Sequence, residues 1–295
     1  MKPRNSALDF KSIFLLIVIC ASWGFNQVAI KVTNHTIPPV LQAGIRSIGA
    51  AVLVMVWMRY RRVPLFEKDK TLWWGILVGL LFSIEFILIY CGLDFTNASR
   101  AVIFLYTTPF FVALGAAIFI PGEKLSRGQF LGLSLAFVGI VTAFGESLSM
   151  PTSKMLIGDI MMVFAAVLWG ATTVIIKASP LAAIKPGKTL FYQLAVSGMI
   201  MPAASILLNE PGLGNMTGLG MSSLIFQIVW IAFITYFAWF WLISNYSVSR
   251  LSSFTFLTPM FGVLCGIVLL NESITLNLIV ALLMVGTGIY VVNRK

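Results

Sequence analysis

Charged residues are scarce in this chain. Only 10% of its 295 residues are Asp, Glu, Lys or Arg, whereas a soluble globular domain contains about 25%. Hydrophobic residues make up 59%, and the mean hydropathy is +0.97. A chain of this composition cannot build a water-facing surface. This excludes a soluble domain and predicts an integral membrane protein.

Histidine and cysteine are almost absent. His35 is the single histidine, and Cys20, Cys91 and Cys265 form no Cys-x-x-Cys pair. An odd number of dispersed cysteines supports neither a disulfide framework nor a thiolate metal site. The sequence also lacks a phosphate-binding Gly-Lys motif and a compact cluster of acid and base residues. We therefore expect no metal, no cofactor, and neither enzymatic activity nor ATP-driven pumping.

The net charge of +10 would indicate a nucleic-acid partner if the basic residues shared one amphipathic face. They lie instead between apolar runs, where Lys and Arg report membrane topology. We therefore expect no nucleic-acid partner.

Long apolar runs are what the sequence does contain. A helix needs about 20 apolar residues to cross about 30 Å of hydrocarbon, and the runs are continuous rather than alternating, which favours helices over a barrel. The first run follows basic residues as a signal peptide would, but no small-residue cleavage site follows it, so we expect it to be retained. The predicted helices span residues 12–32, 38–58, 71–92, 97–120, 127–145, 157–178, 189–208, 222–245, 249–270 and 276–292.

Ten helices place both termini on one side of the membrane. If that side is cytoplasmic, only Arg100, Lys154 and Lys31 lie on or near the opposite side, and this asymmetry predicts cytoplasmic termini. The cytoplasmic segments then hold Lys2, Arg4, Lys11, Arg59, Arg61, Arg62, Lys68, Lys70, Lys124, Arg127, Lys185, Lys188, Arg250, Arg294 and Lys295.

A Trp-Gly stretch occurs twice, near the start of each half of the chain. Trp23-Gly24 and Trp169-Gly170 are each followed, at matching spacing, by Val, Ile and Lys. Further blocks recur in the same order: 99–109 matches 249–259 through Ser, Arg, Phe, Thr and Pro, 122–126 parallels 271–275, and Gly139-Ile140 parallels Gly288-Ile289. We interpret the chain as a duplicated unit, with repeats at 1–150 and 151–295 in one integrated membrane domain.

Each repeat contains five helices, and this odd number forces the second copy to enter the membrane from the opposite side. The halves are then an inverted repeat, which is typical of secondary transporters whose binding site lies near mid-membrane between the halves. We predict an all-α integral membrane protein with ten transmembrane helices, arranged as two inverted five-helix repeats around a central cavity.

These features together resemble a known family. The ten helices, the repeated Trp-Gly, the Arg…Pro blocks and the Glu-x-[Leu/Ile]-[Ser/Thr] turns are similar to the drug/metabolite transporter superfamily, in particular its EamA-like branch and the bacterial amino-acid exporters of the aromatic amino acid exporter type. The resemblance implies a cavity lined by helices one to four and six to nine, with helices five and ten at the periphery. Its motifs indicate the superfamily well and the cargo poorly.

Two ionisable residues, Arg46 and Glu85, lie deep within predicted helices two and three. At 1.5 Å per residue both lie roughly 10–12 Å below the outer helix ends, so we expect an ion pair. The pair either pins the two helices together or borders the cavity, where Arg46 would meet a carboxylate and Glu85 an ammonium or a proton. The second half aligns Gln193 or Tyr192 with Arg46, and Thr235 with Glu85.

Other polar and aromatic residues are candidates for the cavity wall. Asn26, its counterpart Thr172 and the adjacent Thr173 either join helices or line the cavity, and Trp23 and Trp169 lie deeper than the interfacial belt that usually anchors Trp. Trp239 and Trp241 fit that belt better. The residues that we predict to bind substrate are Trp23, Asn26, Arg46, Glu85, Tyr90, Trp169, Thr173, Tyr192, Gln193 and Tyr236.

Pro109 and Pro259 lie well inside helices four and nine, where proline kinks a helix and frees the carbonyl four residues back. Thr108 and Thr258 can compensate for the freed carbonyls of Leu105 and Thr255. Matching positions in the two halves indicate paired hinges, and the alternative is a pair of static kinks.

Charged residues near the helix ends are expected to have structural roles. Lys31 and Lys177 are expected to snorkel to the interface, and Glu123 and Glu272 to serve as turn or capping groups. Arg100 and Arg250 stand at helix starts, where a cation is unfavourable, so each should have a partner such as a carboxylate or a lipid phosphate.

The sequence therefore favours a secondary transporter in the bacterial inner membrane that exports amino acids or similar amphiphilic metabolites by alternating access. The alternative is a carrier of organic cations, nucleotide-sugars or phosphate compounds. The expected partners are a small-molecule substrate and membrane lipid. The cargo, the coupling to protons and the oligomeric state, a monomer included, stay open.

Overall fold

The structure is a computed structural model that describes residues 8–65, 70–145, 150–270 and 275–294. Within these residues, ten helical spans are long and apolar enough to cross a membrane, and each overlaps one of the ten predicted ranges. The all-α, ten-helix membrane architecture predicted from the sequence is therefore confirmed.

Some spans are single helices and others are broken. The unbroken spans are α1 (Phe10–Asn34), α2 (Pro39–Tyr60), α3 (Thr71–Leu93), α6 (Arg127–Phe144), α7 (Ser153–Ala178), α8 (Pro186–Leu207) and α13 (Leu276–Asn293). The broken spans are α4 (Ala98–Leu105) with α5 (Thr108–Phe119), α9 (Gly218–Phe226) with the π-helix η3 (Gln227–Thr235) and α10 (Tyr236–Asn245), and α11 (Val248–Phe254) with α12 (Leu257–Leu270). A short 3-10 turn, η2 (Pro180–Ala183), precedes α8.

Local sequence signals fix several helix starts. The Ser126 hydroxyl accepts a hydrogen bond from the Gln129 N–H (3.1 Å), completing a capping box at α6. The Thr275 hydroxyl accepts from the Leu278 N–H (3.3 Å) at α13. Both hydroxyls belong to the Glu-x-[Leu/Ile]-[Ser/Thr] turns, and residue 272 itself lies outside the described residues.

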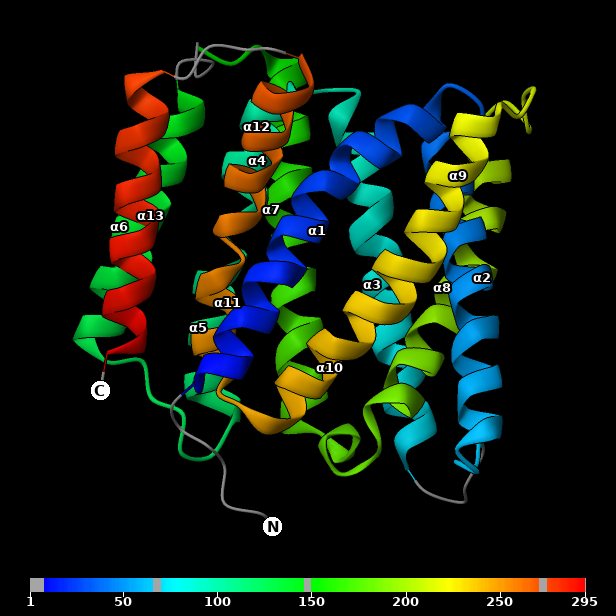
Figure 1. The fold of residues 1–295 in the computed structure, drawn as a ribbon, viewed down its shortest axis with the longest axis horizontal. Helices are drawn as coiled ribbons and strands as arrows, with labels where there is room; N and C mark the ends of the chain where they lie inside the picture. Colours follow the sequence, from blue (N-terminus) through cyan, green and yellow to red (C-terminus); the bar gives the residue numbers. More distant parts are fainter. Residues whose placement is uncertain (1–7, 66–69, 146–149, 271–274, 295) are drawn as a thin grey trace.

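The helices of the two halves interleave (Figure 1). The first helix of each half packs mainly on the other half: α1 lies against α12 and α9, and α7 lies against α3, α5 and α4. The second helix of each half also packs on the other half, because α2 and α8 lie against each other. The core is therefore built from both halves at once, and a cavity between them is walled by each.

The helices α6 and α13 pair at one side of the molecule, at the left of Figure 1. Their backbones approach closely because Gly132 faces Gly288: a Cβ on Gly132 would lie 2.7 Å from the Gly288 carbonyl oxygen. These are helices five and ten of the chain. Their position agrees with the peripheral place that the family resemblance implied.

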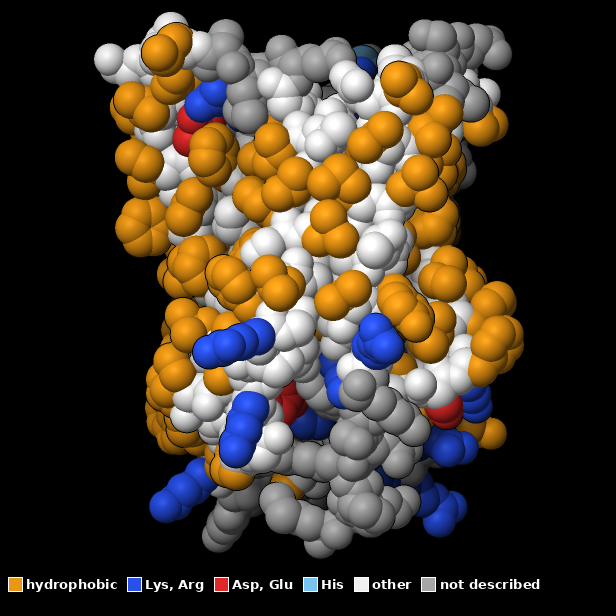
Figure 2. All heavy atoms as spheres, turned by 90° about the vertical axis from the view of Figure 1, so that its left-hand side faces the viewer, with side chains coloured by type: hydrophobic (Ala, Val, Ile, Leu, Met, Phe, Trp, Pro, Cys, Tyr) orange, Lys and Arg blue, Asp and Glu red, His pale blue; other side chains and the backbone are white. Residues whose placement is uncertain are grey.

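α1 begins and α13 ends at the same end of the molecule, which we call the terminal end; the opposite end is the far end. Figure 2 shows a broad apolar surface on the side of α6 and α13, with Lys and Arg side chains gathered toward the terminal end. The apolar band and the basic terminal end are the surface expected of a protein that crosses a membrane.

Candidate functional site

A central cavity of about 670 Å³ lies between the two halves. Its walls come from α1, α2, α3 and α4 of the first half and from α7, α8, η3, α10 and α12 of the second. Phe144, at the end of α6, also reaches it. A cavity of this volume is in the range of small-molecule sites.

The cavity opens at the far end. There its lining residues Asn34, Leu93 and Asp94 are exposed. Toward the terminal end, its lining residues Ile176 and Ile243 are buried. Among the described residues, the cavity is therefore accessible at the far end and covered toward the terminal end.

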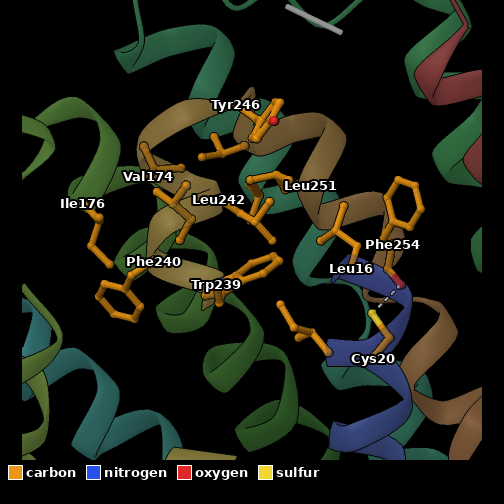
Figure 3. Packing of buried hydrophobic residues seen from close by; sticks show 14 of the residues in the cluster. Leu16, Cys20, Val174, Ile176, Trp239, Phe240, Leu242, Tyr246, Leu251 and Phe254 are labelled. Carbon is orange, nitrogen blue, oxygen red and sulfur yellow. Dashed lines mark hydrogen bonds between the residues drawn. The ribbon is translucent and has the colours of Figure 1, made fainter. Parts of the chain in front are cut away.

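Toward the terminal end, buried apolar side chains pack against one another (Figure 3), and we call this cluster the apolar plug. Side chains from α1, α7, α10 and α11 converge there, among them Leu16, Ile176, Phe240 and Leu251, all at most 3% exposed. The Lys177 ammonium adds a polar tie, since it donates to the last carbonyls of α10, Ile243 (2.5 Å) and Ser244 (3.0 Å). The expectation that Lys177 snorkels to the interface is wrong, because its side chain is bound inside the closed end.

Glu123 makes a second tie at the terminal end. It lies in the turn between α5 and α6, and its carboxylate accepts hydrogen bonds from the Ser247 hydroxyl (2.9 Å), the Val248 N–H (3.1 Å) and the Ser249 N–H (3.3 Å). A carboxylate at a helix N-terminus is favoured by its free N–H groups and its dipole. Glu123 is thus a capping group, but for α11 in the other half of the chain.

Arg46 and Glu85 both line the cavity, and they form no ion pair. Their side chains are 1% and 5% exposed, yet Nε and Nη2 of Arg46 and Oε2 of Glu85 have no hydrogen-bond partner among the described residues. The ion pair expected from their equal depth is therefore absent. Equal depth along two helices does not make two side chains neighbours. Here α2 packs mainly on α8, and α3 packs mainly on α7 and α8.

The guanidinium of Arg46 does have an aromatic neighbour. Its Cζ lies 4.9 Å from the centroid of the Phe86 ring, a cation–π arrangement. Leaving a buried charge without a counter-charge is costly. The cavity therefore contains a buried guanidinium and a buried carboxyl group, each with atoms that a ligand could bind.

Four neutral polar groups in the cavity wall also have no hydrogen-bond partner within the part of the chain that the structure describes. They are Asn26 Oδ1, Thr172 Oγ1, Gln193 Oε1 and Thr258 Oγ1. By contrast, the predicted Thr173 hydroxyl is used within α7, where it donates to the Trp169 carbonyl (3.1 Å). Buried polar atoms are normally satisfied, so these four positions are where a bound molecule or water would form hydrogen bonds.

Aromatic rings from both halves meet in the cavity. The ring centroids of Trp23 and Trp169 are 6.5 Å apart, and Trp23 also stands edge-on to Tyr236 (5.9 Å) and Trp239 (5.4 Å). The indole N–H of Trp23 donates to the Thr235 hydroxyl (2.9 Å), which fixes the ring. Trp239 is 6% exposed and lines the cavity, so its interpretation as a membrane-belt residue is wrong.

Of the ten predicted substrate residues, nine line the cavity and Tyr192 does not. Tyr192 is buried against Gly75 of α3, and its hydroxyl donates to the Leu65 carbonyl (3.2 Å). Successive residues on a helix point about 100° apart, and here Gln193 faces the cavity while Tyr192 packs on α3. The sequence left this choice open, and the structure selects Gln193.

The Pro109 and Pro259 segments interrupt their helices, but in different surroundings. The Thr108 hydroxyl donates to the Leu105 carbonyl (2.7 Å), as expected, and also approaches the Ala166 carbonyl (3.3 Å). In the second half, the Thr255 carbonyl is satisfied by the backbone N–H of Thr258 (2.9 Å). The Thr258 hydroxyl stays without a partner and faces the cavity beside Pro259.

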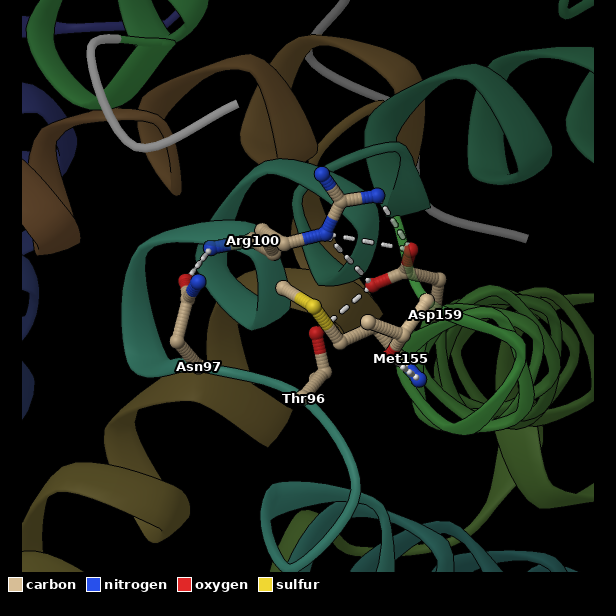
Figure 4. Close-up of polar contacts among 6 residues, drawn as sticks. Thr96, Asn97, Arg100, Met155 and Asp159 are labelled. Atoms are coloured by element: carbon tan, nitrogen blue, oxygen red, sulfur yellow. Dashed lines mark hydrogen bonds and ion pairs between the residues drawn. The ribbon is translucent and has the colours of Figure 1, made fainter. Parts of the chain in front are cut away.

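Arg100 has the carboxylate partner that its position at a helix start required. Nη2 of Arg100 lies 2.5 Å from Oδ2 of Asp159, and Nε donates to both carboxylate oxygens (3.2 Å each). Figure 4 shows this pair, together with the Thr96 hydroxyl that donates to Asp159 (2.8 Å). Sequence reasoning missed Asp159, although an acidic residue inside an apolar run was a signal that could have found it.

The comparisons with known proteins agree with this architecture. The EamA-like transporter family matches the chain twice, over residues 10–145 and 156–294. The chain is 26% identical to the uncharacterized transporter YoaV of Bacillus subtilis, covering 93% of this chain and 94% of that protein.

Other relatives carry names that mention a cargo. A Salmonella typhimurium protein named "probable amino-acid metabolite efflux pump" is 28% identical over 95% of this chain and 94% of its own length, and an Escherichia coli protein of the same name is 25% identical over 94% and 93%. A solved crystal structure matches with a TM-score of 0.82 at 17% identity, covering 95% of this chain and 97% of that one. At that identity the structure shows a shared fold.

Proposed function

The chain belongs to the EamA-like transporter family, and on that premise we propose that it is a secondary transporter that exports amino acids or similar small amphiphilic metabolites across the bacterial inner membrane. The observation that carries the cargo proposal is the unpaired Arg46 and Glu85 in one aromatic cavity. A zwitterion supplies a carboxylate for the guanidinium and an ammonium for the carboxylate, so each buried charge gains its partner from the same molecule.

The aromatic rings specify the rest of the cargo. Trp23, Trp169, Tyr236 and Trp239 offer π faces and edges with few polar atoms, which favours an apolar or aromatic side chain on the zwitterion. Asn26, Thr172 and Gln193 then serve as hydrogen-bonding groups that fix its orientation.

Phosphorylated cargo fits less well. A phosphate group carries up to two negative charges and is typically bound by several converging cations. Among the described residues that line the cavity, Arg46 is the single Lys or Arg. The same wall contains Glu85 and Asp94, which would repel a phosphate.

We propose alternating access by two inverted five-helix repeats, residues 1–150 and 151–295. The double family match, the two Thr-Pro interruptions and the exchange of α1 and α7 between the halves support it. If the terminal end is cytoplasmic, as its basic residues indicate, the described state is open to the outside and closed to the cell. Exchange of the two halves' conformations would open the cavity to the cytoplasm, with the segments at Pro109 and Pro259 as the hinges.

A transport screen tests the cargo and the coupling together. The purified protein is reconstituted into liposomes that are loaded with labelled amino acids, with and without a proton gradient. The flux of each amino acid is then compared between the wild type and Glu85→Gln. We expect flux of amphiphilic amino acids. Flux of organic phosphates or cations with none for any amino acid would overturn the cargo proposal. Loss of gradient-driven accumulation alone in Glu85→Gln would assign proton coupling to Glu85.

A further inference from the structure

The ion pair at the far end has an unpaired counterpart at the terminal end. Arg100 of α4 and Asp159 of α7 join the two halves near the far end. Adding 150 to the number of Arg100 gives Arg250, in the first turn of α11. Subtracting 150 from the number of Asp159 gives Asp9, the N-cap of α1. The Trp-Gly match aligns α1 with α7 at an offset of 146, so Asp9 lies about one helical turn before residue 13, the position that aligns with Asp159. Arg250 therefore repeats Arg100, and Asp9 supplies a carboxylate on the matching helix, one turn away.

The third member of the cluster is repeated as well. The Thr96 hydroxyl donates to Asp159 Oδ1 at 2.8 Å, and the residue at the same offset, Tyr246, donates its hydroxyl to Asp9 Oδ1 at 3.1 Å. Arg250 follows Tyr246 by four residues, just as Arg100 follows Thr96. The scaffold that presents the arginine to the carboxylate is thus in place at both ends.

The two clusters differ in burial and in one contact: Arg100 and Asp159 are buried, whereas Asp9 is exposed. At the far end the arginine is bound to the carboxylate. At the terminal end, Arg250 is half-buried, and its side chain makes no ion pair or hydrogen bond with the described residues. Hydrogen bonds from Ser12, followed by that from Tyr246, hold the pKa of Asp9 below its usual value. Asp9 is therefore anionic at neutral pH and available to a cation.

We propose that Arg250 and Asp9 form an ion pair when the cavity opens at the terminal end, and that the Arg100–Asp159 pair then separates. The inference rests on the alternating-access mechanism proposed above. In an inverted repeat, the second opening is reached when each half adopts the other's conformation. The contact made now by α4 with α7 would then be made by α11 with α1.

The cost of the exchange is small, which suits a reversible switch. One charge-assisted contact is lost and an equivalent one forms, so neither state is strongly favoured by the pair. The hydroxyl groups of Thr96 and Tyr246 keep each carboxylate oriented in the state in which its ion pair with the arginine is not formed.

Chemical labelling tests the proposal without any cargo. A cysteine at Ile176, which is 3% exposed in the plug, is introduced after replacement of Cys20, Cys91 and Cys265. Its labelling rate by a membrane-impermeant maleimide from the terminal side measures the population open at that end. Arg250→Gln and Asp9→Asn should each slow labelling about tenfold, the factor given by 1.4 kcal/mol. Arg100→Gln should accelerate it.

Charge exchange separates a specific pair from a general effect. The double variant D9R/R250D should label within about twofold of wild type, while each single reversal labels more slowly. Lys11→Gln, an exposed cation two residues from Asp9, should label as wild type does. Unchanged labelling in Arg250→Gln and Asp9→Asn, or no recovery in the double variant, would overturn the pair. If labelling changes as expected but no amino acid is transported, the ion pair is supported and the amino-acid cargo proposal is contradicted.

Discussion

The two halves of the cavity share a backbone plan and differ in charge. The first half contributes Arg46 and Glu85, whereas the aligned positions of the second half hold Gln193 and Thr235. The Thr-Pro interruption of the first half is tied by Thr108, and that of the second leaves Thr258 unbonded in the cavity wall. Under the proposed duplication, both halves keep the helix break, while the charged residues among the described cavity lining all belong to the first half.

The largest effect should come from making the first half neutral like the second. Arg46→Gln removes the cation that we propose binds the carboxylate of the cargo. A charge-assisted hydrogen bond contributes about 1.5–3 kcal/mol, so apparent affinity for an amino acid should fall about tenfold or more. Flux into proteoliposomes measures it. Arg59→Gln, on the exposed terminal part of the same helix, is the matched control, and equal losses in both variants would contradict the assignment.

The next effect concerns the anion of the first half. Glu85→Gln should weaken binding of an amino acid by about tenfold, because the ammonium loses its counter-charge. A cargo analogue that lacks the amino group should bind the wild type and Glu85→Gln with equal affinity. Competition against a labelled amino acid measures the affinity of the unlabelled amino acid and that of the deaminated analogue. Equal weakening for the amino acid and the deaminated analogue would show that Glu85 acts on the fold rather than on the ammonium.

A smaller effect should separate the two interruptions. Pro259→Ala restores an N–H that can continue the helix across a break facing the cavity, and about 1 kcal/mol of added backbone hydrogen bonding would slow turnover about fivefold. Pro109→Ala should change turnover less, because the Leu105 carbonyl already has the Thr108 hydroxyl. Turnover is measured at saturating cargo. Equal slowing by the two variants would mean that both breaks move alike.

The smallest effect is one of stability. Thr108→Val leaves the Leu105 carbonyl without its hydroxyl donor and should cost about 1 kcal/mol. Thr258→Val removes a hydroxyl that has no partner and should leave stability unchanged or raised. Thermal unfolding in detergent compares the two. A larger loss in Thr258→Val than in Thr108→Val would reverse the comparison.

Much of the fold could be predicted because the membrane restricts the choices. Run length, hydropathy and turn residues placed ten helices, and proline chemistry located the breaks at Pro109 and Pro259. Trp23 and Trp169 were correctly placed in the cavity wall, where their rings meet. These are local or periodic signals, and a single sequence contains them.

Lateral relations in the cavity could not be predicted in the same way. Depth along a helix follows from residue number, but the distance between helices does not, so Arg46 and Glu85 were wrongly paired and Asp159 was missed. The rotation of α8 decided between Gln193 and Tyr192. The π-helix η3, which precedes Tyr236, gave no recognisable sequence signal.

The most direct test of the central claim is competition with cargo analogues that lack one charge. Transport of a labelled aromatic amino acid is measured against its decarboxylated amine and its deaminated acid, in the wild type and in Arg46→Gln. We expect the intact zwitterion to compete at least about tenfold better than either analogue, and Arg46→Gln to abolish its advantage over the amine. Equal competition by all three compounds in the wild type would contradict recognition of a zwitterion by Arg46 and Glu85.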